Sequence, residues 1–308
     1  MSNQLYVAEN ITKKYTGRIN SFSLDNISVE LKAGEITGVV GENGNGKTTL
    51  LRIIAGELSI SEGLIQYPQM NVELPKWKPI KEKIAYIPQR VPRWFGVLKD
   101  NLHLKATAHG IIGKENENLV ANLLEELGLS EFANHKWSEI STGYRLRFQL
   151  AKMLVGSPQL IILDEPIANL DINAQQKFLS DLQKIVNQKD RQISIILSSQ
   201  QLHEIEDVSQ NINFLKKGKL LYGGSVNDYG KERQENTFEI SLDVTSSEIK
   251  NLLEGIPTKN IAELSGKFII ETETSVNSSQ LLKHFLDQGK TIHYFRDIIT
   301  STKKLFNQ

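Results

Sequence analysis

Residues 41–49 combine the residue types and the spacing that bind phosphate groups. Four residues separate Gly41 from a Gly-Lys-Thr run, and apolar residues stand on both sides of the segment. Glycines let backbone N–H groups curl around an anionic phosphate, and a following helix would point its positive end at it. Lys47 would reach the terminal phosphates, and Thr48 could hold Mg²⁺. The residues expected to contact a nucleotide are Gly41, Asn43, Gly44, Asn45, Gly46, Lys47, Thr48 and Thr49.

A chance match to this spacing would occur on the order of once per hundred chains of this length. A second element argues against chance, because the apolar run at residues 160–163 ends in Asp164 and Glu165. The carboxyl ends of parallel strands are where such sheets bind ligands. Two acids at that point suit a carboxylate that holds a metal ion, Asp164, and one that activates water, Glu165.

The composition excludes several other classes of function. The 36 basic residues balance the 36 acidic ones, so no strongly basic nucleic-acid groove is expected. The absence of cysteine excludes disulfides, thiolate metal sites and cysteine nucleophiles. No apolar run approaches the roughly 18 residues of a membrane span, and the first residues do not resemble a signal peptide. We therefore expect a cytoplasmic protein without nucleic-acid partners, which would reach a membrane only through a partner.

The order of six motifs over roughly residues 4 to 225 resembles the ATPase subunit of an ATP-binding cassette (ABC) transporter. They are Tyr15 in a Lys-Lys-Tyr-Thr-Gly turn, the phosphate loop (residues 41–49), Gln89 in Tyr-Ile-Pro-Gln, Ser141-Thr-Gly143-Tyr-Arg, Asp164-Glu165 and Asn169-Leu-Asp171. The resemblance implies an α/β fold, a P-loop ATPase with a parallel-sheet core, an antiparallel β subdomain and a helical subdomain. The bound groups would be ATP and Mg²⁺.

The same resemblance implies how the site works. Tyr15 would place its ring against adenine, although an ordinary surface tyrosine in a turn stays an alternative. Mg²⁺ would be held by Thr48, Gln89 and Asp164, while Glu165 polarises the attacking water. Two such subunits would pair head to tail, so that Ser141 and the helix amides near Gly143 meet the ATP of the opposite subunit.

Two positions depart from the usual family pattern. Thr142 and Tyr144 replace the commoner Gly and Gln, a variant that resembles exporter ATPases with separate membrane subunits. Gln200 stands where the family usually has a histidine that contacts the γ-phosphate. An amide can donate a hydrogen bond but cannot exchange a proton near neutral pH. We expect Gln200 to share the catalytic role with Glu165 and Gln89, with slow hydrolysis as a possible consequence, and His203 to be a surface residue.

The pattern of elements predicts two domains. Residues 1–228 would form the ATP-binding domain, with a helical subdomain at about 97–158, because strand-like and helix-like runs alternate. Residues 234–308 show strands and helices in the order βαββαβ, which predicts a small α+β accessory domain; a plain stability or dimerisation appendage is an equal alternative.

These features favour the energy-coupling subunit of a membrane exporter, which works as a homodimer on integral membrane transporter subunits. The alternative is a slow or regulatory ATPase that switches a membrane complex without transporting a substrate, and Gln200 favours it modestly. Trp94 and Phe95 follow two arginines, Arg90 and Arg93, just after Gln89. Trp and Arg are frequent interface anchors, so we expect this pair to dock the membrane subunit rather than to be core.

Overall fold

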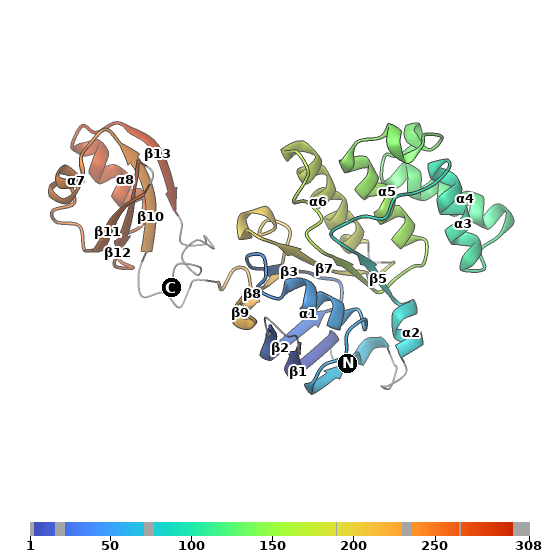
Figure 1. Ribbon diagram of the computed structural model, residues 1–308. Helices are drawn as coiled ribbons and strands as arrows, with labels where there is room; N and C mark the ends of the chain where they lie inside the picture. The colour runs from blue at the N-terminus through green and yellow to red at the C-terminus, as the bar shows by residue number, and fades with distance from the viewer. Residues whose placement is uncertain are drawn as a thin grey trace. The chain divides into compact units, whose positions relative to one another are not determined.

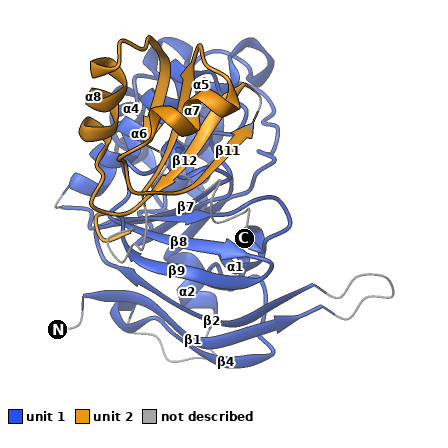
Figure 2. Cartoon of the chain, turned by 90° about the vertical axis from the view of Figure 1, so that its left-hand side faces the viewer, with its two compact units in different colours: residues 1–226 blue, residues 227–308 orange. Residues whose placement is uncertain are grey.

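The computed structural model describes residues 3–15, 22–70, 77–188, 190–229, 236–264 and 266–297. The chain divides into two compact units, residues 1–226 and 227–308, which are coloured separately in Figure 2. Among the described residues, no helix is long and apolar enough to cross a membrane.

The core of the first unit is a six-stranded sheet in which five neighbouring strands run parallel. Its strands, in spatial order, are β5 (Ile84–Ile87), β6 (Leu160–Leu163), β7 (Ser194–Ser199), β3 (Ile36–Val40), β8 (Asn211–Lys216) and β9 (Lys219–Ser225). The last strand pairs antiparallel to β8. Strands β3, β6 and β7 are buried along their whole length, as expected for parallel strands that are covered on both faces.

Helices cover this sheet from both sides (Figure 1). Helices α1 (Lys47–Ile54) and α6 (Ile172–Asn187) both contact β7, and Figure 1 draws α1 below the strands and α6 above them. The carboxyl ends of β5, β6, β7 and β3 are neighbours along one edge of the sheet. Residues that follow these four strands are therefore brought together although they are far apart in the sequence.

A second, antiparallel sheet is formed by the first part of the chain. Its strands, in spatial order, are β2 (Ser23–Lys32), β1 (Gln4–Lys14) and β4 (Glu62–Gln66). Tyr6 and Ile11 of β1 and Ile27 of β2 are fully buried against residues of α1 in one core. The expected turn after Tyr15 lies outside the described residues.

The helical part of the first unit extends from residue 98 to residue 154. It contains α3 (Leu98–Ala108), α4 (Gly113–Glu126), 3₁₀ turns at Ser130–Phe132 and Trp137–Glu139, and α5 (Thr142–Leu154). The leucine face of α4 is buried at Leu123 and Leu124, and Gly128 adopts a left-handed φ of 57° just beyond the helix. Short elements complete the unit: a 3₁₀ turn at Pro68–Met70, α2 (Trp77–Glu82) and a 3₁₀ turn at Leu202–Glu204.

Trp94 is a core residue, so the prediction that it docks a partner is wrong. Its side chain is 5% exposed, stacks on Trp137 with ring centroids 5.2 Å apart and meets Phe148 edge-on. Phe95 is 84% exposed. The two neighbours differ in burial because Trp94 packs against two aromatic side chains from the helical part of the unit. The local sequence does not reveal those contacts.

The second unit contains a four-stranded antiparallel sheet and two helices. Along the chain the elements are β10 (Asn236–Leu242), α7 (Ser246–Leu252), β11 (Thr258–Leu264), β12 (Lys267–Thr272), α8 (Ser278–Asp287) and β13 (Ile292–Asp297). The spatial order β11-β12-β10-β13 is that of a split βαβ fold. Its own apolar core includes Phe238, Ile270 and Phe285, so the unit buries a core without help from the first one.

We predict that a chain lacking residues 234–308 folds and keeps the nucleotide affinity expected from its phosphate loop, because each unit has a separate core. Circular dichroism during heating should show one cooperative transition, and titration with a fluorescent ATP analogue should match the full chain. A folded truncation that no longer binds the analogue would place the second unit in the site.

Candidate active site

The phosphate loop lies between the buried strand β3 and helix α1. Gly46, at the N-cap of α1, has a φ of 104°, which a side chain would strain. A Cβ added there would stand 2.5 Å from Leu24 Cδ2, and one added at Gly41 would stand 2.6 Å from the carbonyl oxygen of Leu215. Both positions therefore require glycine, and the loop can curl tightly at the amino-terminal end of α1.

Lys47 is buried at the centre of the site. It is 4% exposed, and its Nζ donates to the carbonyl oxygens of Gly41 at 2.5 Å and Glu42 at 3.2 Å. It also forms an ion pair with Glu165 Oε1 at 2.9 Å. Two carbonyls and one carboxylate thus hold the ammonium inside the loop, where it can meet an anionic phosphate.

The other loop residues divide into buried and exposed positions. Asn45 is buried: its Oδ1 accepts from the Lys217 amide at 2.9 Å, while its Nδ2 has no hydrogen-bond partner among the described residues. Asn45 therefore ties the loop to the turn between β8 and β9 through its side chain. Asn43, Gly44 and Thr48 are exposed, and Thr49 is half-buried.

Thr48 and Asp164 form a pair of oxygen donors that fits Mg²⁺. Thr48 Oγ1 donates to Asp164 Oδ2 at 2.8 Å, and the hydroxyl of Tyr86 donates to the same oxygen at 3.3 Å. Mg²⁺ prefers hard oxygen ligands and is usually bound by one or two side chains together with substrate phosphates. Among the described residues no cluster of three or more His, Cys, Asp or Glu side chains could hold a metal ion by itself. Such a pair of oxygen donors suits a metal that binds together with a nucleotide.

Glu165 follows β6 in a conformation that its neighbours must enforce. Its φ is 46°, which is uncommon for a residue other than glycine. Ser198 Oγ, from the adjacent strand β7, accepts from the Glu165 amide at 2.8 Å and donates to Asp164 Oδ1 at 2.8 Å. One buried hydroxyl therefore fixes the backbone of one acid and the side chain of the other.

The carboxylate of Glu165 gathers three donors. Its Oε2 accepts from Gln89 Nε2 at 2.9 Å and from Gln200 Nε2 at 3.1 Å, while Oε1 pairs with Lys47. The predicted catalytic residues Glu165, Gln89 and Gln200 thus lie together, each at the end of a neighbouring strand. His203 is exposed on the 3₁₀ turn beyond them, as expected.

The described neighbours of Ser141 and Gly143 lie outside the phosphate loop. Ser141 caps α5, with its Oγ accepting from the Tyr144 amide at 3.4 Å, and is exposed. A Cβ on Gly143 would approach Ala174 Cβ at 3.0 Å. Tyr15 is partly exposed, 6.4 Å from the ring of Phe22. Phe22 in turn lies close to Gly46. The ring of Phe22 therefore stands between Tyr15 and the phosphate loop.

Sequence reasoning missed Ser198 and Tyr86. Ser198 stands in a strand run that reads as core, and its only signal is a hydroxyl at the carboxyl end of that strand. Tyr86 stands in Tyr-Ile-Pro-Gln, three residues before Gln89, and its only signal is its place in that motif. Both donate to Asp164 because their strands, β5 and β7, are the two neighbours of β6 in the sheet. The spacing of residues along the chain does not reveal this order.

Comparison with known proteins places this geometry in a family. Residues 24–168 match the ABC transporter family model. An uncharacterized ABC transporter ATP-binding protein of Methanocaldococcus jannaschii is 32% identical over 71% of this chain and 77% of its own length. The molybdate/tungstate import ATP-binding protein WtpC of Pyrococcus abyssi is 28% identical over 84% of this chain and 72% of its own length.

A solved structure supports the fold. The dimeric, post-hydrolysis structure of an ATP-binding cassette bound to ADP and Pi superimposes with a TM-score of 0.62 at 22% identity. The superposition covers 72% of this chain and 98% of the chain in that structure. The family resemblance and the α/β P-loop fold expected from the sequence are therefore confirmed, and the chain belongs to the ATP-binding subunits of ABC transporters, a family of ATPases.

Proposed function

We propose that the chain is the ATP-hydrolysing subunit of a membrane exporter, and that it works as a head-to-tail dimer. The observation that carries the proposal is the gathering of Lys47, Gln89 and Gln200 around Glu165, beside the Thr48 and Asp164 oxygens. A buried cation, hard oxygen donors for Mg²⁺ and a carboxylate held by amides are the parts that phosphoryl transfer to water needs. Glu165 would polarise the water, and Lys47 would hold the terminal phosphate.

The position of residues 141–145, which we call the signature segment, supports the proposed dimer. Ser141 is exposed and begins α5, a 13-residue helix whose amino-terminal end carries a positive partial charge. Neither Ser141 nor Gly143 has a described contact with the phosphate loop. A second copy in head-to-tail orientation would place these groups on the far side of the γ-phosphate, which a single copy leaves to solvent.

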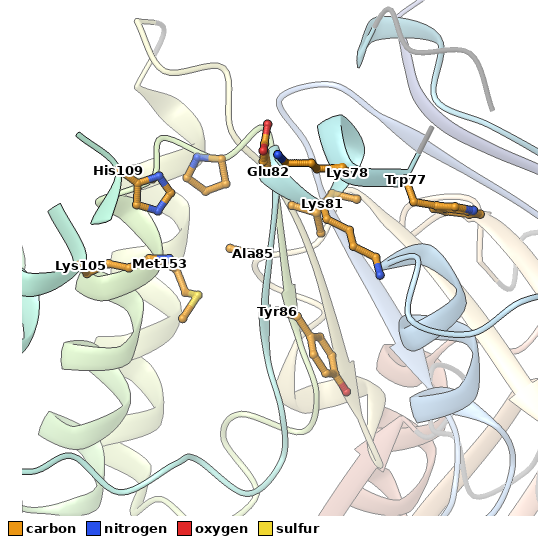
Figure 3. A pocket seen from close by; sticks show the side chains of 12 residues that line it. Trp77, Lys78, Lys81, Glu82, Ala85, Tyr86, Lys105, His109 and Met153 are labelled. Carbon is orange, nitrogen blue, oxygen red and sulfur yellow. The ribbon is translucent and has the colours of Figure 1, made fainter. Parts of the chain in front are cut away.

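A hollow in the first unit suits a membrane subunit. It has a volume of about 520 Å³, and Figure 3 shows Trp77, Lys78 and Lys81 of α2 on one side and Lys105 and His109 on the other. Burial and the Lys105 ammonium lower the pKa of His109 from its ordinary value, so the lysines carry most of the positive charge here. We propose that an acidic helix of the membrane subunit occupies this hollow, where three lysines outnumber the one acid, Glu82.

The direction of transport is proposed from the Ser-Thr-Gly-Tyr-Arg segment, which resembles the exporter variant. WtpC, a relative of similar coverage, is named as an import protein. The direction is decided by measuring ATP-driven substrate movement in inside-out vesicles that contain the chain and its membrane partner. Accumulation inside them supports export, and ATP-driven release contradicts it.

A second candidate, a slow ATPase that switches a membrane complex, is favoured by Gln200. Its amide nitrogen donates to Glu165 Oε2, so the side chain holds the acid but has no group that exchanges a proton near neutral pH. Tight ATP binding with infrequent hydrolysis would follow.

We predict that Glu165→Gln keeps ATP binding and lowers turnover by about 10²–10⁴-fold, because it removes the base and leaves Lys47 and the loop amides in place. The change also leaves the buried Lys47 ammonium without its carboxylate, which costs stability until phosphate supplies a new anion. The variant should therefore melt at a lower temperature than the parent without ATP and gain more from added ATP. Size-exclusion chromatography with ATP and Mg²⁺ should show a dimer; hydrolysis at the parent rate would remove Glu165 from this role.

We predict that Gln200→His raises ATP turnover, because a histidine adds a group that can exchange a proton beside Glu165. A gain of about tenfold or more, equivalent to roughly 1.4 kcal/mol of barrier, would show that the natural chain is a slow ATPase. A smaller gain would show that the amide already suffices. A fall in turnover, together with loss of activity in His203→Ala, would instead assign the phosphate contact to His203.

We predict that the double change Lys78→Glu, Lys81→Glu lowers the fraction of the chain recovered with membranes from cells that hold its membrane partner. The reason is repulsion between the new carboxylates and an acidic helix. Nucleotide affinity should not change. The matched control places the same two charges at Lys32 and Lys219, which are exposed on other elements. Equal membrane recovery of both double variants would contradict docking at this hollow.

A further inference from the structure

The end of strand β7 contains a hydrogen-bonded brace to which sequence reasoning assigned no role. Ser199 Oγ donates to Glu204 Oε2 and accepts from the Gln201 amide at 3.0 Å. The next residue is Gln200, whose side chain donates to Glu165. We propose that Glu204 is a positioning residue for ATP hydrolysis: by holding Ser199 it sets the backbone from which Gln200 reaches Glu165. This inference rests on the proposed roles of Glu165 and Gln200.

Ser199 is the junction through which such a brace can act on the site. Its carbonyl oxygen accepts from the Gly41 amide at 3.2 Å, so the first residue of the phosphate loop is bonded to the same residue that Glu204 holds. Ser199 itself is buried. The phosphate loop, the Gln200 side chain and the brace therefore meet at one residue. The backbone bond from Gly41 does not involve Glu204, so it keeps the phosphate loop in place when the brace is removed, and the change falls on Gln200.

Gln200 depends on this backbone because open space lies beside its side chain. A hollow of about 160 Å³ is lined by Gln200 together with Glu165, Ser199 and Glu204. A half-buried amide beside such a hollow is held by hydrogen bonds and by the direction of its own backbone more than by packing. The hydrogen bonds at Ser199 fix that direction.

Glu204 is itself fixed well enough to serve as a brace. It ends the 3₁₀ turn Leu202–Glu204, and both Leu202 and Ile205 are buried in the core. The Ile205 amide donates to the Leu202 carbonyl at 2.9 Å, which closes the turn. The carboxylate of Glu204 is only partly buried, so its removal opens no large cavity and the fold should persist.

The experiment measures the steady-state ATPase activity of the full chain with Mg²⁺. Glu204→Ala should lower kcat about tenfold with little change in KM, because a misplaced group loses rate while the phosphate loop still binds ATP. Glu204→Gln keeps an oxygen that can accept from Ser199 and should retain most of the parent kcat. The matched control is His203→Ala, on the same turn and exposed, which should leave kcat unchanged.

A double-mutant cycle separates positioning from a general structural effect. If Glu204 acts through Gln200, then Glu204→Ala in a Gln200→Ala background should lower kcat by less than about twofold further. Full tenfold losses in both backgrounds would overturn the proposal, and so would equal losses in Glu204→Ala and Glu204→Gln. An unchanged kcat in Glu204→Ala would overturn it as well.

Glu165→Gln distinguishes the failure of this inference from the failure of the proposed function. Loss of turnover in Glu165→Gln with parent activity in Glu204→Ala would refute only the brace. Parent activity in Glu165→Gln would refute the site on which both proposals rest.

Discussion

The buried ion pair between Lys47 and Glu165 is the interaction on which the arrangement of the site depends. The two side chains are 4% and 6% exposed, and their charged atoms stand 2.9 Å apart. Removing either partner would leave an uncompensated charge in the interior, which typically costs 3–5 kcal/mol. The pair also joins two parts of the chain, because Lys47 opens α1 after β3 while Glu165 follows β6. The sheet order that puts only β7 between those strands is what brings the two charges together.

Strand β7 serves both sides of this pair. Ser198 fixes the strained backbone at Glu165 and one oxygen of Asp164, while Ser199 bonds to the first residue of the phosphate loop. A positive φ at a residue other than glycine persists only where its surroundings determine it. Here the surroundings are a buried hydroxyl on the amide and three donors on the carboxylate.

The phosphate loop and the Asp164-Glu165 pair could be predicted because the residues of each are contiguous and have a fixed spacing. The alternation of strands and helices likewise predicted a parallel sheet. Ser198 and Glu204 were not predicted, since their roles come from strand neighbours and from one turn beyond a buried strand. Trp94 shows the converse failure: tryptophan beside arginine is typical of an interface, but Trp137 and Phe148 make it core. The domain limits and the functional roles of all the predicted site residues stay predictions.

The donors around Glu165 differ in what they can do when ATP binds. In the proposed function the γ-phosphate and Glu165 would compete for one ammonium, so Lys47 could not pair with both equally. Gln89 and Gln200 are neutral amides, and they can keep their hydrogen bonds to Glu165 Oε2 while Lys47 turns to phosphate. In the proposed function, transfer of Lys47 from Glu165 to phosphate would therefore leave Glu165 held by the two neutral amides, which keep its carboxylate oriented when a water must be activated.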